Sequence, residues 1–179
     1  MKTVTSLIDL KALENNIRLI KGMLNTNVQL IGVIKANAYG HSAKRCAKVL
    51  DKYVSTFAVA RIEEALELRQ LGCTKDILLL GGFFSEDDLP IIESNDLSFA
   101  IHSQWMLDMI EKYKPNKKLK AWCQVNIGME RLGFNENEVD EIYQKMSTSI
   151  FLEQPINMLS HLSCADLKAN DEITQKQLQ

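Results

Sequence analysis

One stretch of the chain decides the fold class and points to a reactive site: Leu30-Ile31-Gly32-Val33-Ile34-Lys35-Ala36-Asn37-Ala38-Tyr39-Gly40-His41. Its first five residues carry no charge, which predicts a strand of a parallel sheet, buried on both faces. Lys35 follows where that burial ends. Partial desolvation disfavours the ammonium form, so we expect a free amine that can react with a carbonyl group. On spacing alone, the more common role is a lysine that only extends its head group into solvent.

Short apolar runs alternate with longer amphipathic segments along the chain, which is the pattern of repeated βα units. We predict strands over 29–34, 56–60, 77–80, 97–101, 119–125 and 156–159. We predict a first helix from the spacing of Leu10, Leu13, Ile17 and Ile20, and further helices over 43–51, 62–71, 86–94, 104–113, 136–146 and from 171 onward. Ser85 and Ser103 fit helix N-caps, and Gly72 fits the position after a helix. The alternation predicts a parallel sheet with right-handed crossovers.

The fold class expected from this pattern is an α/β, TIM-type (β/α) barrel that is incomplete. A closed eight-stranded barrel takes ~250 residues, whereas the chain has 179. We therefore expect residues 1–179 to form one partial barrel domain of about six βα units. Open strand edges would leave N–H and C=O groups unpaired. Either the chain is part of a longer protein, or it covers its edge by oligomerising.

Composition excludes several classes of protein. With 46% hydrophobic and 25% charged residues, the chain has the make-up of one globular core. A net charge of -2 provides no basic footprint for nucleic acid, so no such partner is expected. The lysine cluster is expected to be a solvated helix end and turn around Pro115, and it consists of Lys112, Lys114, Lys117, Lys118 and Lys120.

We expect a cytoplasmic protein with no membrane partner, because the first six residues lack an apolar signal region and no later run is long enough to cross a bilayer. The cysteines predict reduced thiols, mostly buried, and no metal site. They are widely spaced without a C-x-x-C pair, at Cys46, Cys73, Cys123 and Cys164.

Four segments, in the same order, resemble motifs of the alanine racemases, which are pyridoxal-phosphate enzymes built on a TIM-type barrel. These segments are IDLKALENNI at 8–17, VIKANAYGH at 33–41, IGMERLGF at 127–134 and SHLSCAD at 160–166. The resemblance implies the amino-terminal barrel portion of such an isomerase, with the remaining strands and a carboxy-terminal β domain beyond it. The implied activity is interconversion of L- and D-alanine for peptidoglycan synthesis, with pyridoxal 5'-phosphate as cofactor.

The resemblance also assigns roles to four residues. Lys35 is implied as the Schiff-base lysine and as the base on one face of the substrate, and Tyr39 as a partner of the cofactor phosphate. Arg131 is implied to bind the cofactor's phenolic oxygen and the substrate carboxylate, which suits a permanently charged fork of donors. His161 is implied to lie against the pyridine ring. Without the motifs, structural roles would be more common for three of these residues: a turn for Tyr39, a surface loop for Arg131 and a strand end for His161.

Several further residues carry only weak indications of a catalytic or binding role, or none. Gly81-Gly82 follows a predicted strand, but it lacks a full phosphate-loop pattern, so we predict a tight turn at the barrel mouth. Cys164 lies three positions after His161, which only weakly indicates nucleophilic catalysis. His41 and His102 are expected to be structural.

The chain departs from the family pattern in three places. Gln124 stands where the family usually has a lysine, often carbamylated, seven residues before the arginine, so Arg131 would be held less firmly. Asn126-Ile127 replaces a common Asp-Thr and removes a carboxylate. Ser42 replaces the usual glycine after AYGH, which is a mild change if its backbone keeps a negative φ.

In the family, the second catalytic base and the arginine that faces the pyridine nitrogen lie beyond the segments matched here. We therefore expect this chain alone to be inactive or nearly so, and the longer parent to be a homodimer. Other interpretations stay open: a racemase for another amino acid such as serine, a non-catalytic pyridoxal-phosphate carrier of the cofactor-homeostasis type, or a structural fragment without cofactor.

Overall fold

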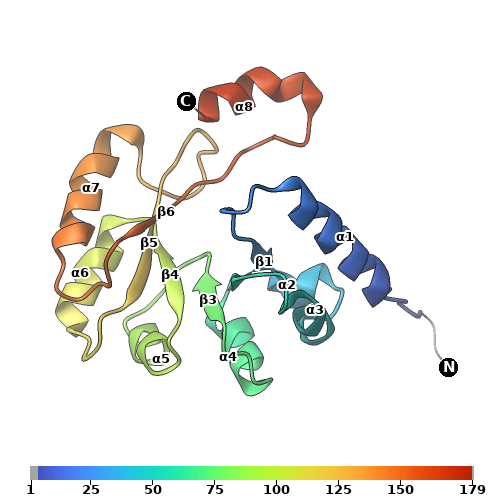
Figure 1. Cartoon of the computed structure of the whole chain (residues 1–179). Coiled ribbons are helices and arrows are strands. Elements are labelled where there is room, and N and C mark those ends of the chain that lie inside the picture. The colour runs from blue at the N-terminus through green and yellow to red at the C-terminus, as the bar shows by residue number, and fades with distance from the viewer. Residues whose placement is uncertain (1–3, 179) are drawn as a thin grey trace. The chain divides into compact units, whose positions relative to one another are not determined.

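The structure, a computed structural model, describes residues 4–178. The chain divides after Leu80 into two compact units, each with three parallel strands and the helices that connect them (Figure 1). Because parallel neighbours need a crossover connection, every strand is followed by at least one helix or helical turn before the next.

The first unit contains α1 (Leu10–Met23), β1 (Ile31–Val33), α2 (Lys35–Tyr39), α3 (Ala43–Leu50), β2 (Thr56–Val59), α4 (Ile62–Gln70) and β3 (Asp76–Leu79). Strand β2 pairs with β1 on one side and β3 on the other, with Phe57 opposite Gly32 and Ile77. All four residues of β2 are buried. Leu68 of α4 packs in the same core. The central strand therefore holds this unit together.

Two sets of polar contacts stabilise α1: a cap at its first turn, and a cluster that joins it to the segment after α3. Asp9 caps the helix, since its carboxylate accepts hydrogen bonds from the N–H groups of Lys11 and Ala12 at 2.9 Å. One turn on, the Glu14 carboxylate accepts hydrogen bonds from Lys52 at 2.5 Å and from the Tyr53 hydroxyl at 2.8 Å. These hydrogen bonds, from Lys52 first and Tyr53 second, lower the pKa of Glu14 to about 2.

The second unit contains α5 (Asp88–Ser94), β4 (Ser98–Ile101), α6 (Gln104–Tyr113), β5 (Lys120–Gln124), α7 (Glu136–Thr148), β6 (Asn157–Leu159), the 3-10 turn η1 (Lys168–Asn170) and α8 (Asp171–Gln177). Strand β5 pairs in parallel with β4 and β6. Phe83 lies edge-on to the rings of Phe99 and Trp105, with centroids 5.5 Å apart in both pairs. Figure 1 shows α6 and α7 side by side next to these strands.

The predicted order of strands and helices is confirmed, with strand ends shifted by at most two residues. Two predictions were wrong. Ser85 is not an N-cap, because α5 begins at Asp88, whose carboxylate accepts the N–H groups of Phe84 and Ser85. The first strand is not buried on both faces, because β1 pairs with β2 alone among the described strands and Val33 is 40% exposed.

The two other predicted helix ends are confirmed. Ser103 occupies the N-cap position of α6, and Gly72 follows the last residues of α4 with φ +84°. The lysine cluster does form a helix end and turn, as predicted. Lys112 pairs with Glu86 at 2.5 Å and Lys120 with Asp96 at 2.7 Å. Within residues 4–178, no helix is both long and apolar enough to cross a membrane.

We expect stability to fall in acid through Glu14. Its pKa is about 2 in the folded chain against an ordinary value of 4.5, so the unfolded chain binds more protons between these values. This contribution is fully present above about pH 5 and is lost as the pH falls toward 2. Chemical denaturation across that range should show a flatter pH dependence for Glu14→Gln than for the original chain. Glu111→Gln, at an exposed position on α6, serves as control and should leave the slope unchanged.

Candidate active site

Lys35 follows β1 by two residues and opens an unusual turn. From Ala36 to Tyr39, four consecutive non-glycine residues have φ between 50° and 54°, which makes α2 a left-handed turn. The left-handed form costs L-residues roughly 1–2 kcal/mol each. The residues of this turn are mostly small, and the structure shows its left-handed form. Backbone angles with this energetic cost persist only where contacts with the surrounding structure stabilise them.

Three hydrogen bonds hold this turn from outside its own backbone. The Glu64 carboxylate accepts the Ala36 N–H at 2.5 Å, and the Asn37 side-chain oxygen accepts the Ala43 N–H at 2.8 Å, which joins the turn to α3. The ring Nδ1 of His41 lies 3.0 Å from the Ala38 carbonyl. His41 is therefore structural, as expected. The turn leaves Tyr39 59% exposed, with its side chain open to a ligand.

Arg131 lies in a loop that folds back onto the end of β5. Asn126 organises it, since its side-chain oxygen accepts the N–H groups of Gly128 and Glu130, both at 3.1 Å. The loop closes where Phe134 exchanges backbone hydrogen bonds with Gln124 and Asn126, each 2.9 Å long. An asparagine serves this Asx-type turn as well as an aspartate would. The loss of the carboxylate at position 126 therefore does not cost the loop its shape.

Arg131 and His161 line the same small hollow at the carboxyl end of β5, together with Gln124. Gln124 is 7% exposed, and its side-chain oxygen has no hydrogen-bond partner within the described chain. Its amide nitrogen reaches the Leu132 carbonyl only at 3.5 Å. A buried acceptor without a donor is costly, so this hollow favours a donor group brought close to Gln124.

His161 follows β6 by two residues and is exposed. Its neighbour Ser163 is tied to α8, because Gln177 accepts the Ser163 N–H at 3.1 Å and donates to the Ile127 carbonyl at 3.0 Å. The sulfur of Cys164 lies 3.4 Å from the Ser163 hydroxyl. No hydrogen bond between Cys164 and His161 occurs among residues 4–178, so geometry adds nothing to the weak indication of a nucleophilic pair.

The remaining cysteines fit the prediction of mostly buried thiols. Cys46 and Cys123 are buried, and Cys73 and Cys164 are partly buried. Burial raises the pKa of the Cys123 thiol to about 11, so this group stays protonated near neutral pH.

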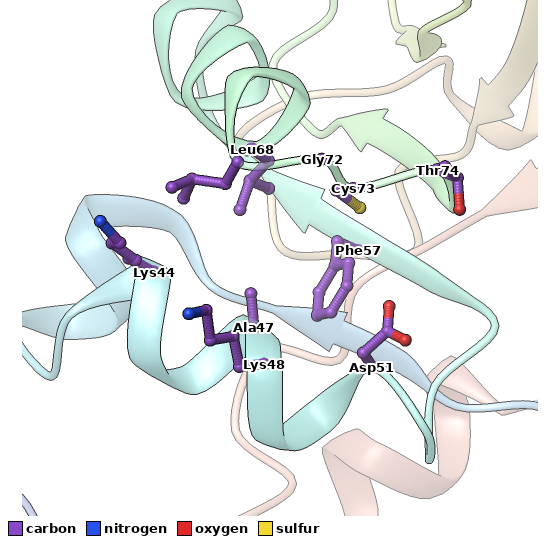
Figure 2. Close-up of a pocket in the computed structure, with 10 residues that line it drawn as sticks. Lys44, Ala47, Lys48, Asp51, Phe57, Leu68, Gly72, Cys73 and Thr74 are labelled. Atoms are coloured by element: carbon purple, nitrogen blue, oxygen red, sulfur yellow. The ribbon is translucent and has the colours of Figure 1, made fainter.

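A cavity of about 300 Å³ lies elsewhere in the first unit, between α3 and α4. Figure 2 shows Phe57 of β2 at its centre, with Lys44, Ala47 and Lys48 of α3 on one side and Leu68 and Cys73 on the other. None of the four predicted site residues lines it. The cavity therefore does not coincide with the strand ends that carry the predicted site residues.

Each unit thus holds two of the predicted site residues just beyond its strands: Lys35 and Tyr39 in the first, and Arg131 and His161 in the second. Carboxyl ends of strands are where barrel enzymes place their chemistry. Two contributors were missed from the sequence. Glu64 was predicted only as part of a helix, although its place three residues after Arg61 is typical of a capping glutamate. Asn126 was considered only as a lost carboxylate.

Gly81-Gly82 forms the predicted turn after β3, and Gly82 has a specific reason to be glycine. A Cβ there would lie 2.5 Å from the Ala100 carbonyl oxygen, and its φ is +67°. The turn is therefore held close against β4, within the second unit.

Comparison with known proteins identifies close relatives. A model of the alanine racemase N-terminal domain matches residues 8–179. The chain is 40% identical to the alanine racemase of Edwardsiella ictaluri, over 93% of this chain and 45% of that protein. It is 39% identical to that of Haemophilus influenzae, over 99% of this chain and 49% of that protein. The chain thus spans about half the length of these relatives.

Solved structures agree. The biosynthetic alanine racemase from Pseudomonas aeruginosa superposes with a TM-score of 0.87 at 29% identity, covering 96% of this chain and 47% of that chain. The alanine racemase of Clostridium difficile in complex with cycloserine gives 0.86 at 32% identity, covering 99% and 50%. These similarities confirm the predicted fold class, an incomplete TIM-type (β/α) barrel.

Gly133→Ala should disrupt the Arg131 loop. A Cβ at Gly133 would lie 2.6 Å from the Asn126 nitrogen, at a φ of +118°. We expect a loss of about 2–5 kcal/mol in the free energy of unfolding, from strain and overpacking together. Gly128→Ala is the matched control, since its φ is +107° but its Cβ would meet only Gln177 at 3.7 Å. It should cost about 1 kcal/mol. Equal losses in urea denaturation would contradict this account.

Ser42→Gly should stabilise the chain. The replacement of glycine by Ser42 would be mild only at a negative φ, and this condition is not met, because the residue has φ +71° at the start of α3. Its side chain makes no capping hydrogen bond that would offset this strain. Glycine should raise the free energy of unfolding by about 1 kcal/mol. Ser42→Ala, which keeps the strain, should bring no such gain. Urea denaturation of the original chain and the two variants measures the difference in the free energy of unfolding.

Proposed function

The chain belongs to the alanine racemase N-terminal domain family, and on that basis we propose that it is the cofactor-binding part of a pyridoxal 5'-phosphate-dependent racemase that interconverts L- and D-alanine. The observation that carries this proposal is Lys35, which stands at the end of a parallel strand on a left-handed turn held by neighbouring elements. Such a turn keeps a reactive amine in a defined place, which is what covalent attachment of a cofactor needs.

The residues present suit this cofactor. Lys35 supplies an amine for its aldehyde, and the exposed Tyr39 hydroxyl suits its phosphate. In the second unit, Arg131 supplies a fork of donors for oxygen anions. The unpartnered oxygen of Gln124 in the same hollow favours a donor beside it, and the Arg131 guanidinium is such a group. Each unit by itself therefore carries groups of the kind that an anionic, aromatic aldehyde would need.

Bound pyridoxal phosphate supplies an electron sink for the negative charge that forms when the amino acid loses its Cα proton. In this proposal, Lys35 would hold the cofactor until the amino group of the substrate takes its place, and the released Lys35 amine would then move the proton at Cα on one face of the substrate. Arg131 binds the substrate carboxylate and the cofactor's phenolic oxygen. Tyr39 orients the phosphate, and His161 covers the ring.

Gln124 changes how Arg131 is held. The carboxamide oxygen of Gln124, which has no partner among the described residues, could accept a hydrogen bond from the guanidinium but would bring no counter-charge, so the positive charge of Arg131 would be left for bound anions. We propose that the chain compensates for the missing charge through the Asn126 turn, which shapes the loop that carries Arg131. The longer parent is proposed to act as a homodimer, with alanine as its small-molecule substrate.

Reductive labelling tests the proposal. The chain is incubated with pyridoxal phosphate, reduced with borohydride, digested and mapped by mass spectrometry. We expect the adduct on Lys35 in preference to the other lysines, including Lys44 and Lys48 beside the cavity of Figure 2. In Lys35→Ala, the selective adduct should disappear. Labelling spread evenly over surface lysines, or unchanged in this variant, would contradict the proposal.

A further inference from the structure

The peptide group after Lys35 is held by a side chain from a different element. The Ala36 N–H donates to one oxygen of the Glu64 carboxylate at 2.5 Å. Glu64 is the third residue of α4, the helix that follows β2. Twenty-eight positions separate the two residues in sequence, so this hydrogen bond is a tertiary contact and not part of the turn.

The other oxygen of the same carboxylate caps its own helix. It accepts the N–H groups of Ala60 at 2.9 Å and Arg61 at 3.0 Å, where β2 gives way to α4. One carboxylate thus accepts three backbone hydrogen bonds from two parts of the chain. An ionised carboxylate is an acceptor at both oxygens, and hydrogen bonds to it are stronger than those to neutral acceptors.

This arrangement fixes the backbone on both sides of Lys35. Before it, the Ile34 N–H continues the sheet by donating to the Ala58 carbonyl at 2.9 Å, and the Ile34 carbonyl, which belongs to the peptide between Ile34 and Lys35, accepts the Ala38 N–H at 2.9 Å. After it, the planar peptide between Lys35 and Ala36 is fixed through its N–H by Glu64. The direction of the Lys35 Cα–Cβ bond follows from these two planes. The turn itself holds the first of these planes through Ala38, and the start of α4 holds the second through Glu64.

We infer that Glu64 is a positioning residue for Lys35, which holds the lysine's backbone in the left-handed turn so that its amine is presented at the end of β1. The inference rests on the proposed function, because it assigns a purpose to the placement of Lys35. Glu64 acts through Lys35 and is not assigned any contact with cofactor or substrate.

The neighbouring Glu63 provides a matched control. It lies on the same helical turn, but its side chain is 74% exposed, and Arg61, at 3.4 Å, is its one ion-pair partner among residues 4–178. Glu64→Gln keeps the shape of the side chain and one acceptor oxygen, but places an NH₂ donor where the second oxygen was. The single remaining oxygen satisfies more donors when it faces Ala60 and Arg61, so we expect the NH₂ group to face the Ala36 N–H and this anchor to be lost. Glu63→Gln removes a charge from the same turn without touching Ala36.

The experiment measures two quantities on the whole 179-residue chain and on both variants. The first is amide hydrogen exchange of the peptide covering 35–41, with the peptide covering β3 as internal reference. The second is the share of the borohydride-reduced pyridoxal-phosphate adduct found on Lys35. For Glu64→Gln, we expect exchange of 35–41 to accelerate about tenfold at unchanged protection of β3, and the Lys35 share to fall severalfold. Glu63→Gln should match the original chain in both.

Each result decides a different statement. Unchanged exchange and unchanged labelling in Glu64→Gln would overturn the inference, while selective Lys35 labelling in the original chain would still support the proposed function. If the original chain shows no selective adduct, the proposed function fails, and the exchange comparison alone decides whether Glu64 holds the turn. Acceleration over 35–41 would then support that role, and equal exchange would overturn it.

A second variant covers the case in which Glu64→Gln unfolds, seen as lost protection of β3. Glu64→Asp keeps a carboxylate for the α4 cap but is one methylene shorter, so it is expected to lose the reach to Ala36. Faster exchange confined to 35–41 with β3 protected would support the inference. Exchange equal to that of the original chain over 35–41 would overturn it.

Discussion

Parallel pairing of the strands is the constraint on which the rest of the structure depends. Because β1, β2 and β3 run in one direction, each needs a helical return, and their carboxyl ends meet at one edge of the first unit. The same holds for β4, β5 and β6 in the second. The loops that carry the predicted site residues begin at these edges. Lys35, Arg131 and His161 owe their place in the fold to this arrangement.

The two loops that carry most of the predicted chemistry are both held by polar side chains against an unfavourable backbone. After β1, four residues adopt left-handed angles, and Glu64 and Asn37 accept hydrogen bonds that hold them. After β5, Asn126 accepts two N–H groups of the Arg131 loop. In each case an acceptor oxygen satisfies backbone donors that no helix or sheet would satisfy. The polar groups around the site therefore serve shape as well as chemistry.

The departures from the family pattern fit this account. Asn126 replaces a carboxylate and still organises its loop, because the turn needs an acceptor oxygen and not a charge. Gln124 leaves a buried oxygen without a partner beside Arg131, a cost that a folded protein retains mainly where a ligand or a moving side chain can relieve it. Ser42 carries a positive φ that glycine would adopt more readily. These three departures thus bear on the local stability of the loops that carry the predicted site residues.

The sequence by itself determined the βα alternation, the order and approximate bounds of six strands, and the placement of Lys35 and His161 just after strands. Hydrophobic periodicity is a local property, and it survives in any fold that buries those residues. The motif resemblance identified the family, and comparison with known proteins confirmed it. Only the tertiary structure decided the left-handed turn at Ala36–Tyr39, the exposure of β1, and the reach of Glu64 to a peptide group 28 positions away. These depend on which elements come to lie beside one another, and the spacing of residues along the chain does not specify such contacts.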